Sequence, residues 1–290
     1  MARLYKERAK NMYLCDYHMH SLHSSDGKSP ISDMCVQAIA SGLKEIAVTD
    51  HFEPSAGNEK YPSYKPENYF LDMSKANSLF GKEIKIKCGV ELGQPHLYPE
   101  YSLKLIQSNA YDYVLASAHR MRSNKDFGDI SYTPENVSFY CDRYLQELRT
   151  LAQWNQFDCI GHLDLVKRYA SKFNVKANLM NYKERLEEIL KLIICNGKGI
   201  EVNTSGLRQS AGECLPGFDI ISFYRQLGGE IITVGSDAHA AEDVGKGIGE
   251  ALEIIKLAGF QCIAVYAGRQ PSMIKISDKA SVYHFSKQPA

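Results

Sequence analysis

The stretch that decides this fold is Glu230-Ile231-Ile232-Thr233-Val234-Gly235-Ser236-Asp237-Ala238-His239. Its first half, residues 230–234, is a short run rich in β-branched residues, which predicts a buried strand. Asp237 and His239 follow this strand and lie two residues apart. Because side chains repeat with a period of two along a strand, both are expected to point the same way. We interpret the stretch as a strand that carries two metal-binding side chains just beyond its end.

A segment near the N-terminus has the same design, Asp16-Tyr17-His18-Met19-His20 after a short apolar start. Between the two segments, apolar runs alternate with helical patterns. Strands are expected at 14–20, 45–49, 84–90, 113–117, 158–161, 199–203 and 230–234. Helices are expected at 30–41, 98–109, 134–156, 178–195, 217–228 and 243–258. A further helix is expected to follow a loop at 52–66 and to end at about residue 80. A last apolar run lies at 262–266.

This alternation of strand and helix predicts a parallel sheet. Seven strand–helix units favour a closed α/β barrel of the TIM type over an open, doubly wound sheet. The chain has 290 residues, of which 44% are hydrophobic, and α/β barrels of this size commonly form one unit. We therefore expect a single domain over residues 1–290, with its active site at the carboxyl ends of the strands.

The composition narrows the classes of partner. Lys plus Arg and Asp plus Glu each number 34, so the formal net charge is zero, which argues against nucleic acid or a membrane surface as a partner. The start MARLYKERAK precedes no apolar stretch, so no signal peptide is expected, and no run of about 18 apolar residues predicts a membrane span. Eight scattered cysteines without a C-x-x-C pair predict reduced thiols in a cytoplasmic protein. Nothing in the pattern specifies an oligomeric state.

Most side chains that could bind a metal fall at the ends of the expected strands. They are His18, His20, Asp26, His51, Glu91, His119, His162, Asp237 and His239. Nitrogen and carboxylate ligands suit Zn, Mn or Fe better than Mg or Ca. Nine ligands are too many for one ion and fit two or three divalent ions, of which Glu91 could bridge two through its two oxygens.

The alternative for each single residue is a structural role. One histidine at a strand end is more often hydrogen-bonded within the fold than bound to a metal, and Asp26 also fits an ordinary polar turn. However, six of the nine histidines in the chain lie at expected strand ends, and this number favours a metal site over separate structural roles. His23, His96 and His284 lie off the pattern, and we interpret them as structural or solvent-exposed.

Two arginines beyond neighbouring strands are candidates for phosphate binding. Arg208 follows the strand at 199–203, and Arg168 follows the strand at 158–161. A guanidinium fork can bind a phosphate through two parallel hydrogen bonds and stabilise charge that develops during its transfer. The alternative for both is a solvated or salt-bridged surface arginine.

Several short motifs resemble those of one family. They are His18-x-His20 with Ser25-Asp26-Gly27, Thr49-Asp50-His51, Gly89-Val90-Glu91, Ser117-Ala118-His119, Gly161-His162 and Gly235-Ser236-Asp237-Ala238-His239. These motifs follow one another along the chain in the order found in the polymerase and histidinol phosphatase (PHP) family, which the chain therefore resembles. The resemblance implies a distorted seven-stranded (β/α)7 TIM-like barrel with a trinuclear metal site. It also implies the ligand sets, which are His18, His20, Glu91 and Asp237 for one ion, Glu91, His119 and His162 for the second, and Asp26, His51 and His239 for the third.

Segments 161–169, 201–208 and 228–239 are similar to the histidinol-phosphatase branch of this family. That resemblance implies hydrolysis of the phosphomonoester L-histidinol phosphate to L-histidinol and phosphate, a step of histidine biosynthesis. We hypothesise attack of a metal-bridging hydroxide on phosphorus, with Arg168 and Arg208 stabilising the charge. Glu53 and Asp164 are candidate acids or partners of the substrate amine, Ser236 is a candidate phosphate contact, and loops 61–69 and 120–133 are candidate lids.

Two other functions remain open at this point. The first is a PHP phosphoesterase that acts on another small phosphomonoester or on a nucleotide. The second is a non-catalytic binding module with a degenerate metal site, against which the complete ligand set argues.

Overall fold

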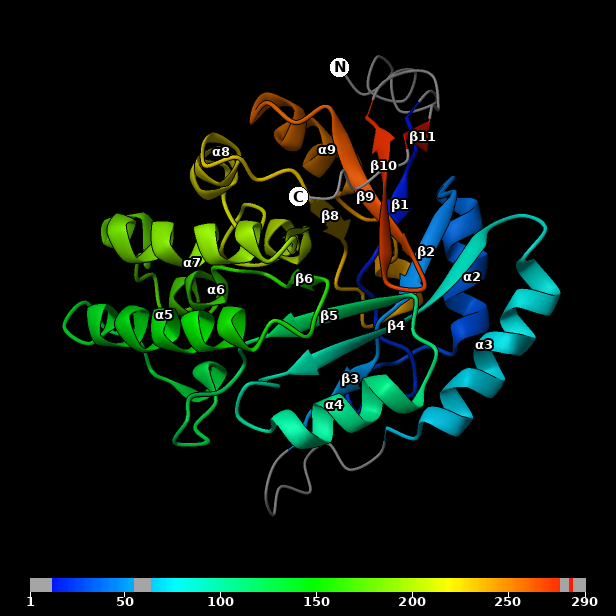
Figure 1. The fold of residues 1–290 in the computed structure, drawn as a ribbon, viewed down its shortest axis with the longest axis horizontal. Coiled ribbons are helices and arrows are strands. Elements are labelled where there is room, and N and C mark those ends of the chain that lie inside the picture. The colour runs from blue at the N-terminus through cyan, green and yellow to red at the C-terminus, as the bar shows by residue number, and fades with distance from the viewer. Residues whose placement is uncertain (1–11, 55–63, 277–281, 284–290) are drawn as a thin grey trace.

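The computed structural model describes residues 12–54, 64–276 and 282–283. Seven strands in these ranges form one parallel sheet in the order β1-β2-β4-β5-β6-β7-β8, and the short strand β3 pairs with β4 (Figure 1). The strands are β1 Cys15–Asp16, β2 Glu45–Val48, β3 His51–Phe52, β4 Lys85–Gly93, β5 Tyr113–Ser117, β6 Cys159–Ile160, β7 Gly199–Asn203 and β8 Ile232–Gly235. The order follows the chain, as repeated strand–helix units require.

The sheet curves until its last strand meets its first. The backbone N–H of Tyr17, just after β1, donates to the carbonyl of Val234 in β8 at 2.9 Å. Met19 and Ala238 continue this seam as an isolated parallel bridge. The strands therefore form a nearly closed barrel, and the seven-stranded TIM-like barrel predicted from the sequence is confirmed.

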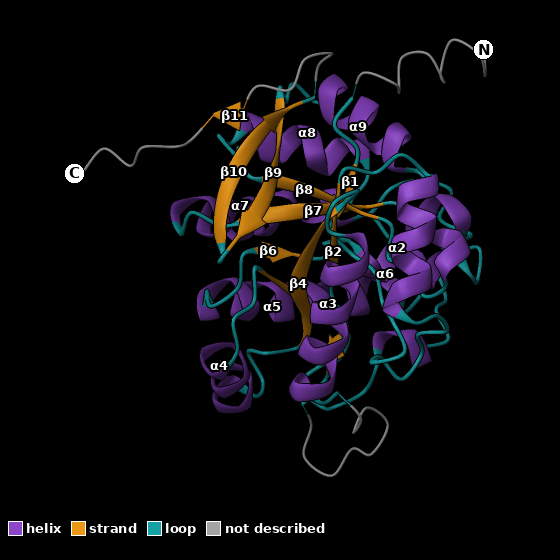
Figure 2. Cartoon of the chain, turned by 90° about the vertical axis from the view of Figure 1, so that its right-hand side faces the viewer, coloured by secondary structure: helices purple, strands orange, loops and turns teal. Residues whose placement is uncertain are grey.

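Helices cover the outside of the barrel (Figures 1 and 2). They are α2 Ile31–Ala40, α3 Pro66–Phe80, α4 Pro99–Ser108, α5 Val137–Trp154, α6 Leu165–Ser171, α7 Lys183–Cys195, α8 Phe218–Gln226 and α9 Ile248–Leu257. No helix in the described part of the chain is long and apolar enough to cross a bilayer.

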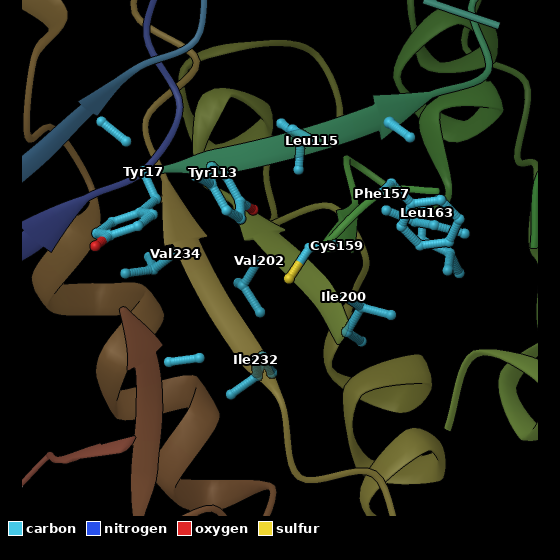
Figure 3. Packing of buried hydrophobic residues seen from close by; sticks show 14 of the residues in the cluster. Tyr17, Tyr113, Leu115, Phe157, Cys159, Leu163, Ile200, Val202, Ile232 and Val234 are labelled. Atoms are coloured by element: carbon cyan, nitrogen blue, oxygen red, sulfur yellow. The ribbon is translucent and has the colours of Figure 1, made fainter. Parts of the chain in front are cut away.

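The core is built from side chains of neighbouring strands. Figure 3 shows Tyr17, Tyr113, Cys159, Val202 and Val234 packed together, and all five are fully or almost fully buried. Burial of such a side chain stabilises a fold by about 1.5–3 kcal/mol. The barrel therefore owes its stability mainly to this apolar packing, which leaves the strand ends to carry polar groups.

An antiparallel hairpin covers one end of the barrel. It consists of β9 (Cys262–Ala267) and β10 (Gln270–Lys275), and the short β11 (Val282–Tyr283) pairs with β10. The ring of Tyr266 lies 4.9 Å from that of Tyr113, the first residue of β5. Arg269, in the turn of the hairpin, donates to Asp158 at 3.0 Å, directly before β6. The hairpin therefore lies at the amino-terminal ends of the strands, away from the predicted ligands.

Several elements differ from the sequence-based expectation. The helix expected at 243–258 begins only at Ile248, because Gly245 and Gly247 both have a φ of +78°, which α-helices do not accommodate. The first strand is shorter than the expected 14–20, so that His18 and His20 lie beyond its end. The run at 262–266 is one arm of the hairpin rather than a lone strand, and α6 occupies a segment for which no helix was expected.

The replacement Arg269→Gln should lower stability, because it removes charge-assisted hydrogen bonds from a carboxylate that is only 4% exposed. A bond of this kind contributes about 1.5–3 kcal/mol. The control is Arg149→Gln, since Arg149 forms a surface pair with Glu188 at 3.9 Å that should contribute about 0–1 kcal/mol. Urea unfolding measures both variants. Equal losses of stability would contradict a role of Arg269 in holding the hairpin to the barrel.

Candidate metal centre

All nine predicted metal ligands lie at the carboxyl-terminal end of the barrel. His18 and His20 follow β1, Asp26 lies in the loop before α2, His51 lies in β3, Glu91 in β4, His119 follows β5, His162 follows β6, and Asp237 and His239 follow β8. The carboxyl ends of parallel strands meet at one edge, which brings these distant residues together. Most are buried, whereas the side chains of Asp26 and His239 are 46% and 32% exposed.

The first group consists of four side chains that converge on one point. The Nε2 atoms of His18 and His20 are 2.9 Å apart, and Glu91 Oε2 lies 3.3 and 3.5 Å from them. Asp237 Oδ1 lies 3.6 and 3.4 Å from the same two nitrogens. Tetrahedral zinc with bonds of about 2.0–2.1 Å places its ligand atoms about 3.3 Å apart. The two nitrogens therefore lie, from each other and from each carboxylate oxygen, at about the spacing that a tetrahedral divalent ion needs.

The second group shares Glu91 with the first. Its other oxygen, Oε1, lies 3.0 Å from His162 Nε2 and 3.4 Å from His119 Nε2. The two nitrogens are themselves 3.4 Å apart. One carboxylate thus presents one oxygen to each of two sets of ligand atoms, which is the geometry of a bridging ligand.

The third group lies nearer to solvent. Asp26 Oδ2 lies 3.2 Å from His239 Nε2 and 3.7 Å from His51 Nε2. The other ring nitrogen of His51 lies 2.9 Å from Glu91 Oε2, so His51 connects this group to the first. The three side chains could hold a further ion with a more open coordination.

The two buried carboxylates of the first group are held in their charged form. Burial alone would raise the pKa of Glu91, but the nearby imidazoles of His18, His51 and His119 outweigh it and hold that pKa well below its usual range. Burial likewise opposes the charge on Asp237, and its histidine neighbours lower its pKa. A metal ligand must be deprotonated, so both groups are in the required state at neutral pH.

Two of the histidines are held neutral. Burial lowers the pKa of His20 well below its usual value, and the neighbouring rings of His51 and His239 lower it further. Burial also lowers the pKa of His162, although the carboxylate of Glu91 opposes this effect. A neutral imidazole has a free lone pair on one nitrogen and can bind a metal without first losing a proton.

The backbone at the end of β8 corrects one expectation. The strand ends at Gly235, and Asp237 has a φ of +54°, in the left-handed region. The strand period therefore does not extend to these two residues, although their side chains still lie close together, with His239 Nδ1 3.6 Å from Asp237 Oδ1. Asp237 joins the first group and His239 the third, because the left-handed turn between them redirects the chain.

Two buried glutamates hold ligand histidines; sequence reasoning missed Glu201 and gave Glu53 a different role. Glu201, in β7, lies 2.7 Å from Nδ1 of His18, and Glu53 lies 2.5 Å from Nδ1 of His119. Glu53, named as a candidate acid or amine partner, is thus occupied by a histidine. The available signal for Glu201 was an acidic residue at the centre of the apolar run 199–203.

Both predicted arginines lie beside the first group. Nη1 of Arg168 donates to Asp237 Oδ2 at 2.9 Å and to the hydroxyl of Ser205 at 3.2 Å. Arg208 donates to the carbonyl of Ser236 at 2.7 Å and lies 3.7 Å from Asp243. A guanidinium carries five N–H donors, so these contacts are compatible with a phosphate contact from the same side chains.

Two other histidines are structural, as expected. His23 lies 3.2 Å from Asp72, and the ring of His96 lies 2.9 Å from Glu147. His284 lies outside the described residues. Neither His23 nor His96 belongs to the groups described above.

Two further candidates are fully buried and are already paired with other groups of the protein. Asp164 is fully buried and pairs with Lys167 at 2.7 Å, so it is unsuited as an acid for the substrate. Ser236 is also fully buried, and its hydroxyl donates to the carbonyl of His18, which corrects its expected role as a phosphate contact. Both residues stabilise the turns that carry their neighbours.

The candidate lids are only partly described. Residues 61–63 of the first lie outside the described ranges, whereas Tyr69 is buried and its hydroxyl donates to the carbonyl of Val48. In the second, the N–H of Phe127 donates to the carbonyl of His119 at 2.9 Å. Each segment is therefore attached to the barrel at one of these residues, Tyr69 in the first and Phe127 in the second.

A barrel with histidine and carboxylate groups converging at its carboxyl end is the architecture of a metal-dependent hydrolase. The family model of the PHP domain matches residues 16–205. This protein belongs to the PHP family, as its motifs indicated.

Relatives that match most of the chain include proteins named histidinol-phosphatase. A probable histidinol-phosphatase of Thermotoga maritima is 32% identical over 252 residues, which is 87% of this chain and 95% of that protein. The histidinol-phosphatase of Lactococcus lactis is 30% identical over 273 residues, 91% and 98% of the two chains. A crystal structure of histidinol phosphate phosphatase from Lactococcus lactis, complexed with zinc, L-histidinol and phosphate, superposes with a TM-score of 0.79 at 27% identity and covers 89% of this chain and 98% of that one.

The position of Glu91 between the first two groups generates a prediction. Glu91→Gln should reduce bound zinc by up to two ions per chain, because an amide is a much weaker ligand than a carboxylate at both sites. Asp26→Asn should reduce it by at most one, since Asp26 contacts only the third group. Inductively coupled plasma mass spectrometry after dialysis measures both, with circular dichroism as a check of folding. A full zinc content in folded Glu91→Gln would exclude the bridging role.

Proposed function

We propose that this protein hydrolyses L-histidinol phosphate to L-histidinol and phosphate with the help of bound divalent metal ions. The observation that carries the proposal is the carboxylate of Glu91, which presents one oxygen to each of two sets of ligand atoms. The two histidinol-phosphatase relatives, matched over at least 95% of their length, support the substrate. The neighbouring structure that holds zinc, L-histidinol and phosphate supports both the metal and the reaction.

The proposed ligand sets follow the three groups. His18, His20, Glu91 and Asp237 would hold one ion, Glu91, His119 and His162 a second, and Asp26, His51 and His239 a third. The nitrogen and carboxylate set suits Zn, Mn or Fe. Ions at these positions would supply Lewis-acid stabilisation of charge on the phosphoryl oxygens.

The chain's own residues would orient the phosphate. Arg168 and Arg208 both precede Asp237 in the chain and approach the first group from the segments after β6 and β7. Their cationic side chains can hold the non-bridging phosphate oxygens and stabilise the negative charge that spreads over them in the transition state. Arg168 has a second role, because its hydrogen bond to Asp237 Oδ2 orients a proposed ligand.

We further infer that residues 1–290 act as one domain in the cytoplasm. The eight cysteines are free thiols, which supports a reducing compartment. The relatives carry the name of an enzyme of amino-acid biosynthesis, which fits the same location. The balanced charge and the small proposed substrate leave no need for nucleic acid or membrane as a partner.

The function is tested by turnover of the purified protein. L-histidinol phosphate should be hydrolysed with a kcat/KM at least about tenfold above those of p-nitrophenyl phosphate and of nucleoside monophosphates, since a site with contacts to the whole substrate discriminates against partial analogues. Chelation with EDTA should abolish the activity, and zinc or manganese should restore it. A higher kcat/KM for a nucleotide would favour the alternative phosphoesterase, and full activity without metal would refute the proposal.

The two arginines should differ in their effects. Arg208→Ala should lower kcat/KM by about 10²–10³-fold while the metal content stays intact, because it removes a donor to the phosphate and contacts no proposed ligand. Arg168→Ala should lower both activity and metal affinity, since it also removes the partner of Asp237. The exposed Arg143, which bonds to Gln146, provides the control. Unchanged kinetics in Arg208→Ala would remove this residue from the site.

A further inference from the structure

We propose that Glu201 is a positioning residue that couples the first two metal sites by holding one histidine of each. The inference rests on the proposed function, because it concerns the ligands of those two sites. Glu201 lies at the centre of β7 and is 1% exposed, so it can reach neither solvent nor a bound substrate. Its role must therefore act through its neighbours.

Each oxygen of Glu201 holds a different histidine. Oε1 lies 2.7 Å from Nδ1 of His18, a proposed ligand of the first site. Oε2 accepts from the backbone N–H of His162, a proposed ligand of the second site, at 2.8 Å, and also from the side-chain amide of Asn203 at 3.2 Å. One carboxylate thus connects two residues that are 144 positions apart in the chain.

The contact to His18 fixes the tautomer of its ring. An ionised carboxylate only accepts hydrogen bonds, so at 2.7 Å the proton must reside on Nδ1. The amide of Asn203 competes for Nδ1 as a donor, but it lies at 3.4 Å and is uncharged. With a proton held on Nδ1, Nε2 is the ring atom that faces His20 and Glu91 and is left to bind the proposed ion. A carboxylate behind a metal-binding histidine orients the ring in this way and makes it a stronger ligand.

The contact to His162 fixes a strained segment of backbone. His162 has a φ of +25°, a value that L-residues rarely adopt and that the surrounding structure must hold in place. The bond from its N–H to Glu201 anchors the backbone at this position. The side chain of His162 leaves from the same backbone and reaches Glu91 at 3.0 Å. Loss of the anchor should therefore misplace the second site as well.

A glycine on the neighbouring strand makes room for this arrangement. A Cβ atom on Gly235 would lie 2.4 Å from Glu201 Oε1 and 2.3 Å from the Cβ of His18. Both distances are shorter than any van der Waals contact. The Gly235 that ends β8 thus allows the glutamate and the histidine to meet.

A buried glutamate at the opposite end of the barrel provides a matched control. Glu45 opens β2, is 2% exposed, and accepts hydrogen bonds from the hydroxyls of Tyr13 and Tyr17 at 2.6 and 2.5 Å. Like Glu201, it is a strand carboxylate with two separate partners, but it contacts no proposed ligand. If Glu201 only stabilised the fold, replacing it and replacing Glu45 should have equal effects on metal binding.

The experiment compares zinc binding to the full-length wild type, Glu201→Gln and Glu45→Gln by calorimetric titration, with circular dichroism to verify folding. Glutamine can accept from only one of the two partners of Glu201 and presents an N–H donor to the other. Glu201→Gln should therefore bind zinc about 10- to 100-fold more weakly at the first site, the second or both. Glu45→Gln should bind zinc as the wild type does, even if its melting temperature falls.

Wild-type affinity in Glu201→Gln would overturn the proposal, and so would an equal loss of affinity in Glu45→Gln. A wild type that binds no zinc would refute the proposed function instead. If Glu201→Gln does not fold, Glu201→Asp keeps the charge but withdraws the carboxylate, and it should also weaken zinc binding. Nitrogen-15 NMR of histidine-labelled wild type gives an independent answer, since zinc-loaded His18 should carry its proton on Nδ1. A proton on Nε2 would overturn the proposal without any variant.

Discussion

The structure depends on one buried carboxylate, Glu91, that faces imidazole nitrogens on several sides. A charge at full burial is costly unless it is compensated, and here His18, His51, His119 and His162 all lie within 3.4 Å of its two oxygens. These partners come from four different strand ends. The barrel must therefore hold its strands in a fixed relation for the charge to be tolerated. Divalent ions between these groups would replace weak contacts with strong ones, so metal binding and folding should reinforce each other.

The two ends of the barrel have different roles: the amino end contributes to stability and the carboxyl end carries the proposed metal ligands. At the amino end, the hairpin covers the core, and its arginine is paired with Asp158, so that polar groups there serve stability. At the carboxyl end, the buried acids Glu91 and Asp237 lie among imidazoles that are also proposed metal ligands. Such an end is stable only with a ligand or with extensive hydrogen bonding behind each group. This division explains why changes at Arg269 and at Glu91 are expected to affect different properties of the protein.

Much of this arrangement could be predicted from the sequence, because it follows from local patterns. Short β-branched runs mark the strands, and polar residues directly after them must meet at one edge of a parallel barrel, which indicated most of the nine candidate ligands. Asp26, in the loop before α2, follows no strand directly. The glutamates behind the ligands could not be predicted in this way. Glu201 and Glu53 act through hydrogen bonds to residues far away in the chain, and only the folded barrel determines those partners. The hairpin was missed for a similar reason, since its pairing involves a strand without a periodic apolar pattern.

The segment that ends β8 shows how local sequence and tertiary structure combine. A strand period alone would send Asp237 and His239 to the same place, and two ions could then not share the segment. In the structure Asp237 adopts a left-handed turn, which aspartate tolerates. Its carboxylate faces His18 and His20, while the His239 ring reaches Asp26. Gly235 just before it lets His18 and Glu201 approach, which in turn points the His18 ring at Asp237. The glycine and the turn therefore act together, and the first site requires both. A side chain at position 235 would displace His18 even though that side chain could bind no metal itself.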